Sequence, residues 1–287
     1  MSAPGQAAPA PLRFVKMHGL GNDFVVVDRR GQDFDPDPAI VRRLADRRTG
    51  IGFDQLLLLD AGRGPRDFRW KIYNADGGEV QQCGNGARCV ALLAAAGRPA
   101  QLALESSGGR VLAEVRENGQ VAIDMGVPDF DPHALPLDLT AANATIAEGV
   151  YTMQAGAQTV SFGAVSVGNP HIVLRVDDVA AAPVEQLGAL LETHAAFPER
   201  TNVGFVQMLT RERLRLRVWE RGAGETMACG TGACAAAAVM RARDASAERM
   251  TVELPGGELT IEWPGEGARL RMTGPATRAY EGSITII

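Results

Sequence analysis

The stretch of sequence that decides the fold is written twice. Residues 73–87 read YNADGGEVQQCGNGA, and residues 219–233 read WERGAGETMACGTGA. Each stretch runs from a β-prone residue through a polar loop to a cysteine, and Gly-x-Gly then opens an Ala-rich apolar segment typical of a buried helix. The two cysteines, Cys83 and Cys229, are 146 residues apart (229 minus 83). We therefore expect two copies of one strand, loop and helix.

Two further pairs of segments recur in the same order. Residues 21–27 (GNDFVVV) match residues 168–174 (GNPHIVL) at an offset of 147 (168 minus 21). Residues 51–55 (IGFDQ) match residues 203–207 (VGFVQ) at an offset of 152 (203 minus 51). Accidental recurrence of short Gly-rich strings is the alternative explanation. Three collinear matches at a nearly constant offset favour an internal duplication into two domain-sized halves.

Strand-like and helix-like segments predict the α+β class. We expect two pseudo-symmetric domains, each a mostly antiparallel sheet or barrel around a central helix. Helices are expected over residues 38–47, 85–96, 183–194 and 231–243. The expected strands are residues 13–17, 24–28, 55–59, 68–73, 110–116 and 120–125 in the first half, and 159–166, 172–176, 213–219, 250–254 and 259–263 in the second.

The predicted domains span residues 12–130 and 145–275. Three prolines between residues 128 and 136 give the segment between the domains the composition of a linker. The C-terminal segment, residues 276–287, ends in an apolar and β-prone run, and we expect it to return to the first domain as a final strand. Residues 1–11 are Ala- and Pro-rich without charged side chains, and are expected to form a disordered tail.

The composition argues against several classes of protein. With 287 residues, 46% of them hydrophobic, the chain can bury a large core. The formal net charge of -5 argues against nucleic acid or an anionic membrane surface as a partner, and no apolar run approaches the roughly 20 residues of a membrane helix. The N-terminus lacks the basic start and apolar centre of a signal peptide, so we expect a cytoplasmic location with the four cysteines reduced.

Cys83 and Cys229 each stand where a helix is expected to begin, a position that suits a reactive thiol. Free N–H groups at a helix start bind anions and favour a thiolate, so the thiol pKa can fall below about 8.5. If the two halves face each other, a ligand between them has one thiol on each side. One thiol could then remove a proton while the other delivers a proton to the opposite face, which inverts the carbon. The sequence therefore predicts an active site in the cleft between the domains.

Other interpretations of the cysteines are open. Buried cysteines are common and usually inert, and we expect this of Cys89 and Cys234. They follow the leading cysteines by six and five residues and so leave their helix faces. Zinc is the other alternative, but the spacings Cys-x5-Cys and Cys-x4-Cys lack the usual pair of closely spaced ligands at both ends. Lys16 and Lys71 are the only lysines, and neither has the context of a pyridoxal phosphate lysine.

The chain resembles the diaminopimelate epimerase family from about residue 14 to its C-terminus. The resemblance rests on residues 16–24 (KMHGLGNDF), 74–77 (NADG), 83–88 (CGNGAR), 168–171 (GNPH), 201–202 (TN), 220–222 (ERG) and 229–232 (CGTG). It implies cofactor-independent and metal-free interconversion of LL- and meso-2,6-diaminoheptanedioate, a step in the synthesis of lysine and of peptidoglycan precursors. It also implies a homodimer.

The resemblance assigns roles to individual residues. Cys83 and Cys229 would be the acid–base pair, and His171 and Glu220 would help to set the protonation of the thiols. The backbone N–H groups of Gly84, Asn85, Gly230 and Thr231 would hold the reacting carboxylate. Further substrate contacts would come from Asn22, Gln55, Asn74, Asn169, Asn202, Glu220 and Arg221.

Physical chemistry supports these roles unevenly. The guanidinium of Arg221 suits a carboxylate at the non-reacting end of the substrate, and Glu220 suits an ammonium group. An Asn beside a Gly, such as Asn22, is often only a turn residue. Gln55 could merely cap a sheet edge, and a single histidine such as His171 is usually structural.

Two other functions compete with this interpretation. A racemase of proline or hydroxyproline would use the same two thiols, but it would not need Glu220 and Arg221 for a distal end. A non-catalytic thiol or metal-binding module is the rival from another class, which the metal content of the protein would test.

Overall fold

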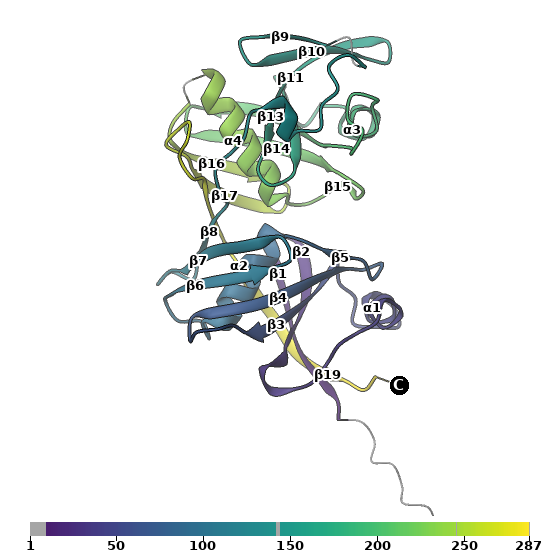
Figure 1. Ribbon diagram of the computed structural model, residues 1–287, viewed down its shortest axis with the longest axis vertical. Coiled ribbons are helices and arrows are strands. Elements are labelled where there is room, and N and C mark those ends of the chain that lie inside the picture. Colours follow the sequence, from purple (N-terminus) through teal and green to yellow (C-terminus); the bar gives the residue numbers. More distant parts are fainter. Residues whose placement is uncertain (1–9, 142–143, 245, 287) are drawn as a thin grey trace, which may run out of the picture.

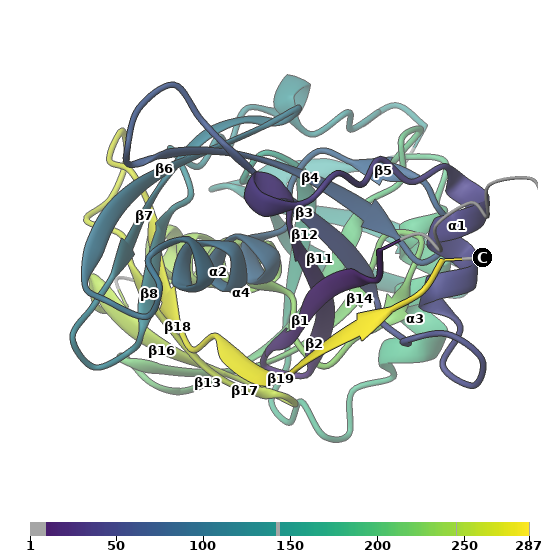
Figure 2. The same ribbon diagram turned by 90° about the horizontal axis from the view of Figure 1, so that it is seen from below.

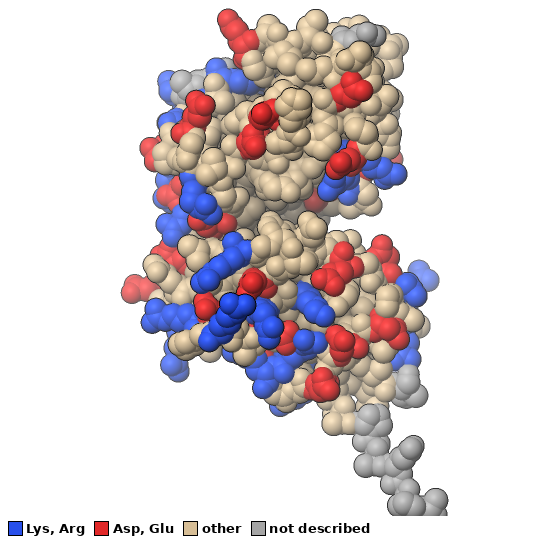
Figure 3. Space-filling model, viewed as in Figure 1, with Lys and Arg blue, Asp and Glu red and all other residues tan. Residues whose placement is uncertain are grey.

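The computed structural model describes residues 10–141, 144–244 and 246–286. It consists of two lobes stacked along the long axis of the molecule (Figure 1). Of the expected disordered tail, residues 1–9 lie outside the described part of the chain. Both lobes carry charges of both signs, and the lysines and arginines on the visible face of the lower lobe are interspersed with acidic side chains (Figure 3).

The first lobe wraps its strands around the helix α2 (Gly84–Ala94) (Figure 2). Ala87, Cys89, Val90 and Ala91 of this helix are buried, so small and branched side chains face the surrounding sheet. A second helix, α1 (Pro38–Ala45), packs outside the sheet. The strands are β1 (Leu12–Gly19), β2 (Asn22–Asp28), β3 (Gln55–Ala61), β4 (Asp67–Asn74), β5 (Glu79–Val80), β6 (Ala100–Ser106), β7 (Gly109–Val115) and β8 (Val121–Asp124).

The second lobe repeats this plan around the helix α4 (Gly230–Asp244), with α3 (Val184–Glu192) outside. The helix α4 is Ala-rich because it lies very close to its sheet: a Cβ atom on Gly163 would lie 2.3 Å from Val239 Cγ1. The strands are β9 (Thr145–Ala147), β10 (Val150–Ala155), β11 (Gln158–Ser166), β12 (Pro170–Arg175), β13 (Asn202–Thr210), β14 (Arg213–Glu220), β15 (Gly224–Glu225), β16 (Arg249–Leu254), β17 (Gly257–Glu262) and β18 (Arg271–Gly274).

Strand pairing makes the duplication explicit. Most pairs are antiparallel, but β2–β3 and β4–β6 are parallel, as are their counterparts β12–β13 and β14–β16. In the first lobe Phe24 pairs with Gln55, and in the second His171 pairs with Asn202, so both partners are displaced by 147 residues (171 minus 24, 202 minus 55).

One of the three expected sequence matches is wrong. Aligning residues 51–55 with residues 203–207 equates Gly52 with Gly204, at an offset of 152. Gly52 lies before β3 with φ +75°, whereas Gly204 lies inside β13. The strand register instead gives the offset of 147, and a chance similarity of two glycine-containing strings explains the false match.

The lobes are joined through strands at their boundary. β8 of the first lobe pairs with β18, which in turn pairs with β17 of the second. The C-terminal strand β19 (Thr277–Ile284) then runs back along the first lobe, where Leu12 on β1 pairs with Ile284 (Figure 1). The crossing strands fix where the two central helices begin relative to one another.

The predicted fold class is confirmed: two repeated domains of mixed sheet with few helices, arranged pseudo-symmetrically. Each of the four helices expected from the sequence is present, with ends that differ by a few residues. Among the described residues no helix is long and apolar enough to cross a membrane.

Candidate active site

A cleft of about 1190 Å³ is lined by residues of both lobes. Among its lining are most of the residues that the sequence singled out: Asn22, Gln55, Asn74, Cys83, Gly84, Asn85, Asn169, Glu220, Arg221, Cys229, Gly230 and Thr231. His171 and Asn202 do not line it, because they are buried behind its wall with 1% and 3% of their surface exposed. The structure therefore gathers both expected thiols and most of the expected polar groups around one space.

Cys83 caps the N-terminus of α2. Its backbone is extended (φ -149°, ψ 109°), and its sulfur accepts a hydrogen bond from the N–H of Gly86 at 3.3 Å. This is the geometry of an N-cap residue, in which a thiol replaces the usual hydroxyl or carboxylate. The same sulfur lies 3.9 Å from Oδ1 of Asn22. The thiol of Cys83 therefore faces both the start of α2 and the part of the cleft wall that the first lobe forms.

Cys229 occupies the equivalent place before α4. Its sulfur accepts a hydrogen bond from the N–H of Gly232 at 3.4 Å and lies 3.6 Å from Oγ1 of Thr231. Cys83 is half-buried, whereas Cys229 is only 4% exposed. The duplication has therefore placed two thiols in the same local geometry but in different exposure to solvent.

The two helix starts touch each other. Nδ2 of Asn85, in the first turn of α2, donates to the carbonyl oxygen of Ala228 at 2.9 Å, immediately before Cys229. Met272 on β18 packs against both: Cβ atoms on Gly84 and Gly230 would lie 2.9 Å and 3.0 Å from Met272 Cε and Sδ respectively. The absence of a side chain at both glycines permits this close approach of the Met272 side chain. The contacts place Cys83 and Cys229 at neighbouring ends of one cleft.

Burial keeps both thiols protonated in the free protein. Burial raises the pKa of Cys83 to about 11, opposed by the hydrogen bond from Gly86 and by the positive charge of Arg88. Burial and the nearby Glu220 carboxylate raise the pKa of Cys229 well above its usual value. From the sequence we expect lowered thiol pKa values at the two helix starts. The hydrogen bonds from the helix N–H groups act in that direction, but desolvation outweighs them.

Glu220 is the acidic group beside the thiols. Burial raises its pKa, while hydrogen bonds from Thr226 and Cys229 act in the opposite direction. Its negative charge also raises the pKa of Cys83. One carboxylate is therefore coupled to both thiols, and it is placed to exchange a proton with Cys229.

Asn202 and Arg221 are linked. Oδ1 of Asn202 accepts the backbone N–H of Arg221 at 2.9 Å, and its Nδ2 donates to the carbonyl oxygen of Pro170 at 2.9 Å. The guanidinium of Arg221 donates to the carbonyl oxygen of Glu199 at 3.1 Å and lines the cleft. The amide of Asn202 is thus used within the protein, and it supports Arg221 from behind.

His171 is a neutral imidazole in this fold. Its Nε2 lies 3.0 Å from Oδ1 of Asn169, which itself lines the cleft. Burial, together with the positive charge of Arg221, lowers the pKa of His171 to about 3. The ring contacts the site through Asn169 rather than directly.

Amide side chains form the cleft wall of the first lobe. Nε2 of Gln55 donates to Oδ1 of Asn74 at 2.9 Å, and Nδ2 of Asn22 donates to Oδ2 of Asp54 at 3.0 Å. Oε1 of Gln55 is buried and has no hydrogen-bond partner among the described residues. Because this oxygen is buried, a ligand can reach it only after the Gln55 side chain turns toward the cleft.

Three residues that the sequence did not single out contribute to the site. Thr226 donates to the Glu220 carboxylate from the loop before Cys229. Arg88 is fully buried in α2 and acts on Cys83 through its charge. Met272 packs against both helix starts. Thr226 and Arg88 belong to the repeated stretch and to the conspicuous CGNGAR string, which could have identified them, but nothing in the local sequence marks Met272.

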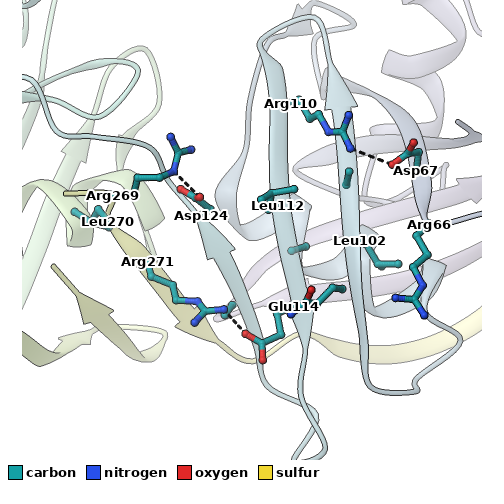
Figure 4. A pocket seen from close by; sticks show the side chains of 14 residues that line it. Arg66, Asp67, Leu102, Arg110, Leu112, Glu114, Asp124, Arg269, Leu270 and Arg271 are labelled. Carbon is teal, nitrogen blue, oxygen red and sulfur yellow. Dashed lines mark hydrogen bonds and ion pairs between the residues drawn. The ribbon is translucent and has the colours of Figure 1, made fainter. Parts of the chain in front are cut away.

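A second hollow of about 540 Å³ lies on the outer face of β6, β7 and β8, beside β18 (Figure 4). Its side chains form ion pairs between Arg110 and Asp67 at 3.2 Å, between Arg269 and Asp124 at 2.6 Å, and between Arg271 and Glu114. None of the expected site residues lines it. In the described part of the chain, no cluster of three or more His, Cys, Asp or Glu is arranged to hold a metal ion. The cleft between the lobes is therefore the candidate active site.

Solved structures of epimerases share this architecture. A predicted epimerase from Pseudomonas aeruginosa superposes with a TM-score of 0.68 at 19% identity, covering 96% of this chain and 100% of that one. A hydroxyproline epimerase from Agrobacterium vitis, with trans-4-hydroxy-L-proline bound, gives 0.67 at 16% identity and covers 96% and 93%. A probable proline racemase from Agrobacterium radiobacter gives 0.66 at 18%, again covering 96% and 93%. At these identities the likeness establishes the fold alone.

The sequence match is more specific. A family model described as diaminopimelate epimerase matches the chain twice, over residues 14–130 and 163–279. The two matched segments each contain one helix-start cysteine and together supply both walls of the cleft. The duplication, the paired thiols and the family match agree, and the chain belongs to the diaminopimelate epimerase family, an isomerase family.

Proposed function

We propose that the protein interconverts LL- and meso-2,6-diaminoheptanedioate without a cofactor. The observation that carries the proposal is the meeting of two N-cap cysteines, Cys83 and Cys229, at one cleft that also contains Glu220 and Arg221. Two thiols at related helix starts suit inversion of an α-carbon. The acidic and basic side chains beside them suit a second amino-acid group on the same substrate.

The thiols work in opposite protonation states. The thiolate takes the α-proton from one face, the electron pair is delocalised into the adjacent carboxylate, and the thiol delivers its own proton to the opposite face. After the reaction the two cysteines have exchanged their states. Because both thiols of the free protein have raised pKa values, one must lose its proton as substrate binds, and Glu220 is the nearest acceptor for Cys229.

Backbone groups at the helix starts stabilise the reacting carboxylate. The first turns of α2 and α4 leave N–H groups without helical acceptors, at Gly84 and Asn85 in one and at Gly230 and Thr231 in the other. These dipoles converge from two sides and favour the extra negative charge of the enolate-like state. Because they belong to rigid helices, they need little reorganisation during the reaction.

The other end of the substrate meets the polar wall. Arg221 can bind the distal carboxylate in a bidentate manner, and Oε1 of Gln55, once turned toward the cleft, can accept from the distal ammonium group. Asn22, Asn74 and Asn169 add further amide groups to the same cleft. Fixing this end orients the reacting carbon between the thiols.

The proposal extends to the setting of the enzyme. This reaction serves the synthesis of lysine and of peptidoglycan precursors, so a cytoplasmic enzyme is proposed. A homodimer is proposed on family membership, with no nucleic acid or membrane partner. Size-exclusion chromatography with light scattering gives the oligomeric state, and a mass matching one chain would remove the dimer from the proposal.

Proline or hydroxyproline racemase activity is the competing function. The architecture is shared with a hydroxyproline epimerase and a probable proline racemase. The cleft of about 1190 Å³, with Arg221 and Glu220 beside the thiols, favours a longer substrate with two charged ends.

One experiment tests both the substrate and the two-base chemistry. Purified protein is incubated in heavy water with LL-2,6-diaminoheptanedioate, and with L-proline and trans-4-hydroxy-L-proline in separate reactions. We expect meso product that carries deuterium at the inverted carbon, with early unreacted substrate unlabelled, because the donor thiol exchanges with solvent between turnovers. Turnover of the proline compounds alone would refute the proposed substrate. Unlabelled meso product would refute the two-cysteine mechanism. Cys83→Ala and Cys229→Ala serve as inactive controls.

A further inference from the structure

The buried carboxylate of Glu192, outside the cleft, is bonded to the segment that carries Glu220 and Arg221. Glu192 ends α3 and is 6% exposed. Its Oε2 accepts the indole N–H of Trp219 at 2.7 Å, and its Oε1 accepts the backbone N–H of Gly222 at 2.8 Å. Trp219 and Gly222 immediately flank Glu220 and Arg221 in the sequence. The carboxylate of Glu192 therefore accepts hydrogen bonds from the residues on both sides of Glu220 and Arg221.

The same carboxylate also reaches the neighbouring segment. Arg200 lies 3.5 Å from Oε1 of Glu192 and adopts the left-handed conformation (φ 61°). Two residues later, Asn202 accepts the backbone N–H of Arg221. Glu192 and Asn202 thus connect the two segments that stand behind this part of the cleft wall.

Close packing also holds α3 against residues 219–222, the segment that Glu192 contacts. Gly188 lies one turn before Glu192, and a Cβ atom there would lie 2.6 Å from Cβ of Trp219 and 2.7 Å from Cγ of its ring. The helix therefore cannot accommodate a larger residue at this position without moving Trp219. Because α3 is packed directly against Trp219, the position of the Glu192 carboxylate relative to residues 219–222 is fixed.

We propose that Glu192 is a positioning residue, whose carboxylate holds Glu220 and Arg221 in the orientation that binds the distal end of the substrate. The proposal rests on the proposed function for the identity of that substrate. A carboxylate is required because the two groups that donate hydrogen bonds to it, the indole N–H and the Gly222 N–H, are joined by a third donor, the Arg200 guanidinium. Each of its oxygens accepts one of the two N–H groups. An amide would present one acceptor and one donor, so one of the two contacts would become donor against donor.

The decisive variant is Glu192→Gln, which keeps the size of the side chain. We expect kcat/KM for the diaminoheptanedioate to fall about 10-fold to 100-fold, the range for losing a hydrogen bond to a buried charged group. The fall should appear in KM as well as kcat, since the distal end is bound less well in the ground state. Glu185→Gln is the matched control, because it removes the same charge from an exposed position of the same helix and should leave kinetics within twofold.

A double-mutant cycle separates positioning from general destabilisation. In Trp219→Phe the indole donor is absent, so the amide of Glu192→Gln can turn its NH2 toward the vacated position without opposing a donor. We expect Glu192→Gln to reduce kcat/KM less than threefold in that background. An equal loss in both backgrounds would overturn the proposed contact, because a merely structural effect of the substitution does not depend on the indole N–H.

Hydrogen exchange of the Gly222 amide tests the contact between Gly222 and Glu192 without substrate. In the wild type this N–H should be protected, and in Glu192→Gln its exchange should accelerate at least tenfold, with no change in Glu185→Gln. Wild-type protein that produces no meso compound would refute the proposed function. The exchange rates would still show whether Glu192 holds residues 219–222 in place. Wild-type exchange at the rate of an open amide, or wild-type kinetics in Glu192→Gln, would overturn the role of Glu192.

Discussion

Replacing Glu220 by Gln should make Cys229 more reactive and the enzyme less active. The carboxylate raises the pKa of Cys229 in two ways, through its charge and by accepting the hydrogen bond of the thiol. Both effects have the same sign and both weaken in the amide. The thiolate therefore becomes easier to form from bulk solution, while the internal proton acceptor is lost.

The size of the effect follows from the contact. Two unit charges about 4 Å apart interact by roughly 4 kcal/mol at an effective dielectric constant of 20. This is about three pKa units, an upper bound at roughly 1.36 kcal/mol per unit. The amide dipole and relaxation of the loop retain part of the interaction, so we expect a fall of about one to two units. At a fixed pH below the pKa of both forms, the thiolate fraction then rises about 10-fold to 100-fold. The alkylation rate rises less, by about 3-fold to 15-fold, because a thiolate of lower pKa is a weaker nucleophile.

The assay isolates one thiol. In a Cys83→Ala background, Cys229 is alkylated with iodoacetamide, an uncharged reagent, and followed by mass spectrometry between pH 7 and pH 10. Cys89 and Cys234 are fully buried and should react slowly. The control is Glu225→Gln, because that carboxylate pairs with Arg217 instead of a thiol.

Catalysis should move in the opposite direction. In protein with both cysteines, Glu220→Gln should lower kcat by about 10²-fold or more, the range for loss of acid–base assistance. Equal or slower alkylation of Cys229 in the double variant at every pH would refute the electrostatic reasoning. Faster alkylation with undiminished kcat would show that Glu220 perturbs the thiol without taking part in the reaction.

Three further outcomes are expected. Arg221→Lys keeps the charge but loses the planar fork, so kcat/KM in steady-state assays should fall at least about tenfold; unchanged kinetics would remove Arg221 from the site. His171 is buried and neutral with a pKa of about 3, whereas the unfolded chain binds its proton below about pH 6.5. Its contribution to stability is therefore present above that pH and lost as pH falls toward 3, by at most about 3 kcal/mol at pH 4. Chemical denaturation of the wild type and of His171→Gln checks this, and equal pH slopes would contradict it. Gly188→Ala should lower the free energy of unfolding by about 1–3 kcal/mol because its Cβ meets Trp219; a rise in Tm, as for an unobstructed Gly→Ala change in a helix, would refute the packing argument.

The fold and the thiols were predictable because their signals are local and repeated. A cysteine followed by Gly-x-Gly and an alanine-rich run specifies an N-cap and a closely packed helix, and α2 and α4 begin within one residue of the expected places. Strands with one buried face, such as β4, show the expected alternation. By contrast β13 was not predicted, since its first five residues are all buried and the alternation is absent.

The details of the site that depend on distant contacts were not predictable. The raised pKa values of the thiols arise from burial between two lobes, and no local pattern states how much solvent is excluded. Asn202 was expected to bind substrate, and no neighbouring residue indicates that its amide instead spans Pro170 and Arg221. Glu192 lies at the end of α3, about thirty residues before Gly222, whose N–H it accepts, and no local pattern connects the two.

The two halves share one backbone arrangement around the thiols but carry different charges there. Applying the offset of 146, Glu220 stands where the first half has Asn74, and Cys234 stands where it has Arg88. The first lobe thus places a buried cation behind its thiol, and the second places a carboxylate beside its own. A symmetric pair of thiols would have equal pKa values and no preferred direction of proton transfer. The two differences act in the same sense on the free protein, because the Arg88 cation lowers the pKa of Cys83 and the Glu220 carboxylate raises the pKa of Cys229. A duplicated site has in this way become suited to a reaction whose two faces need an acid and a base at the same moment.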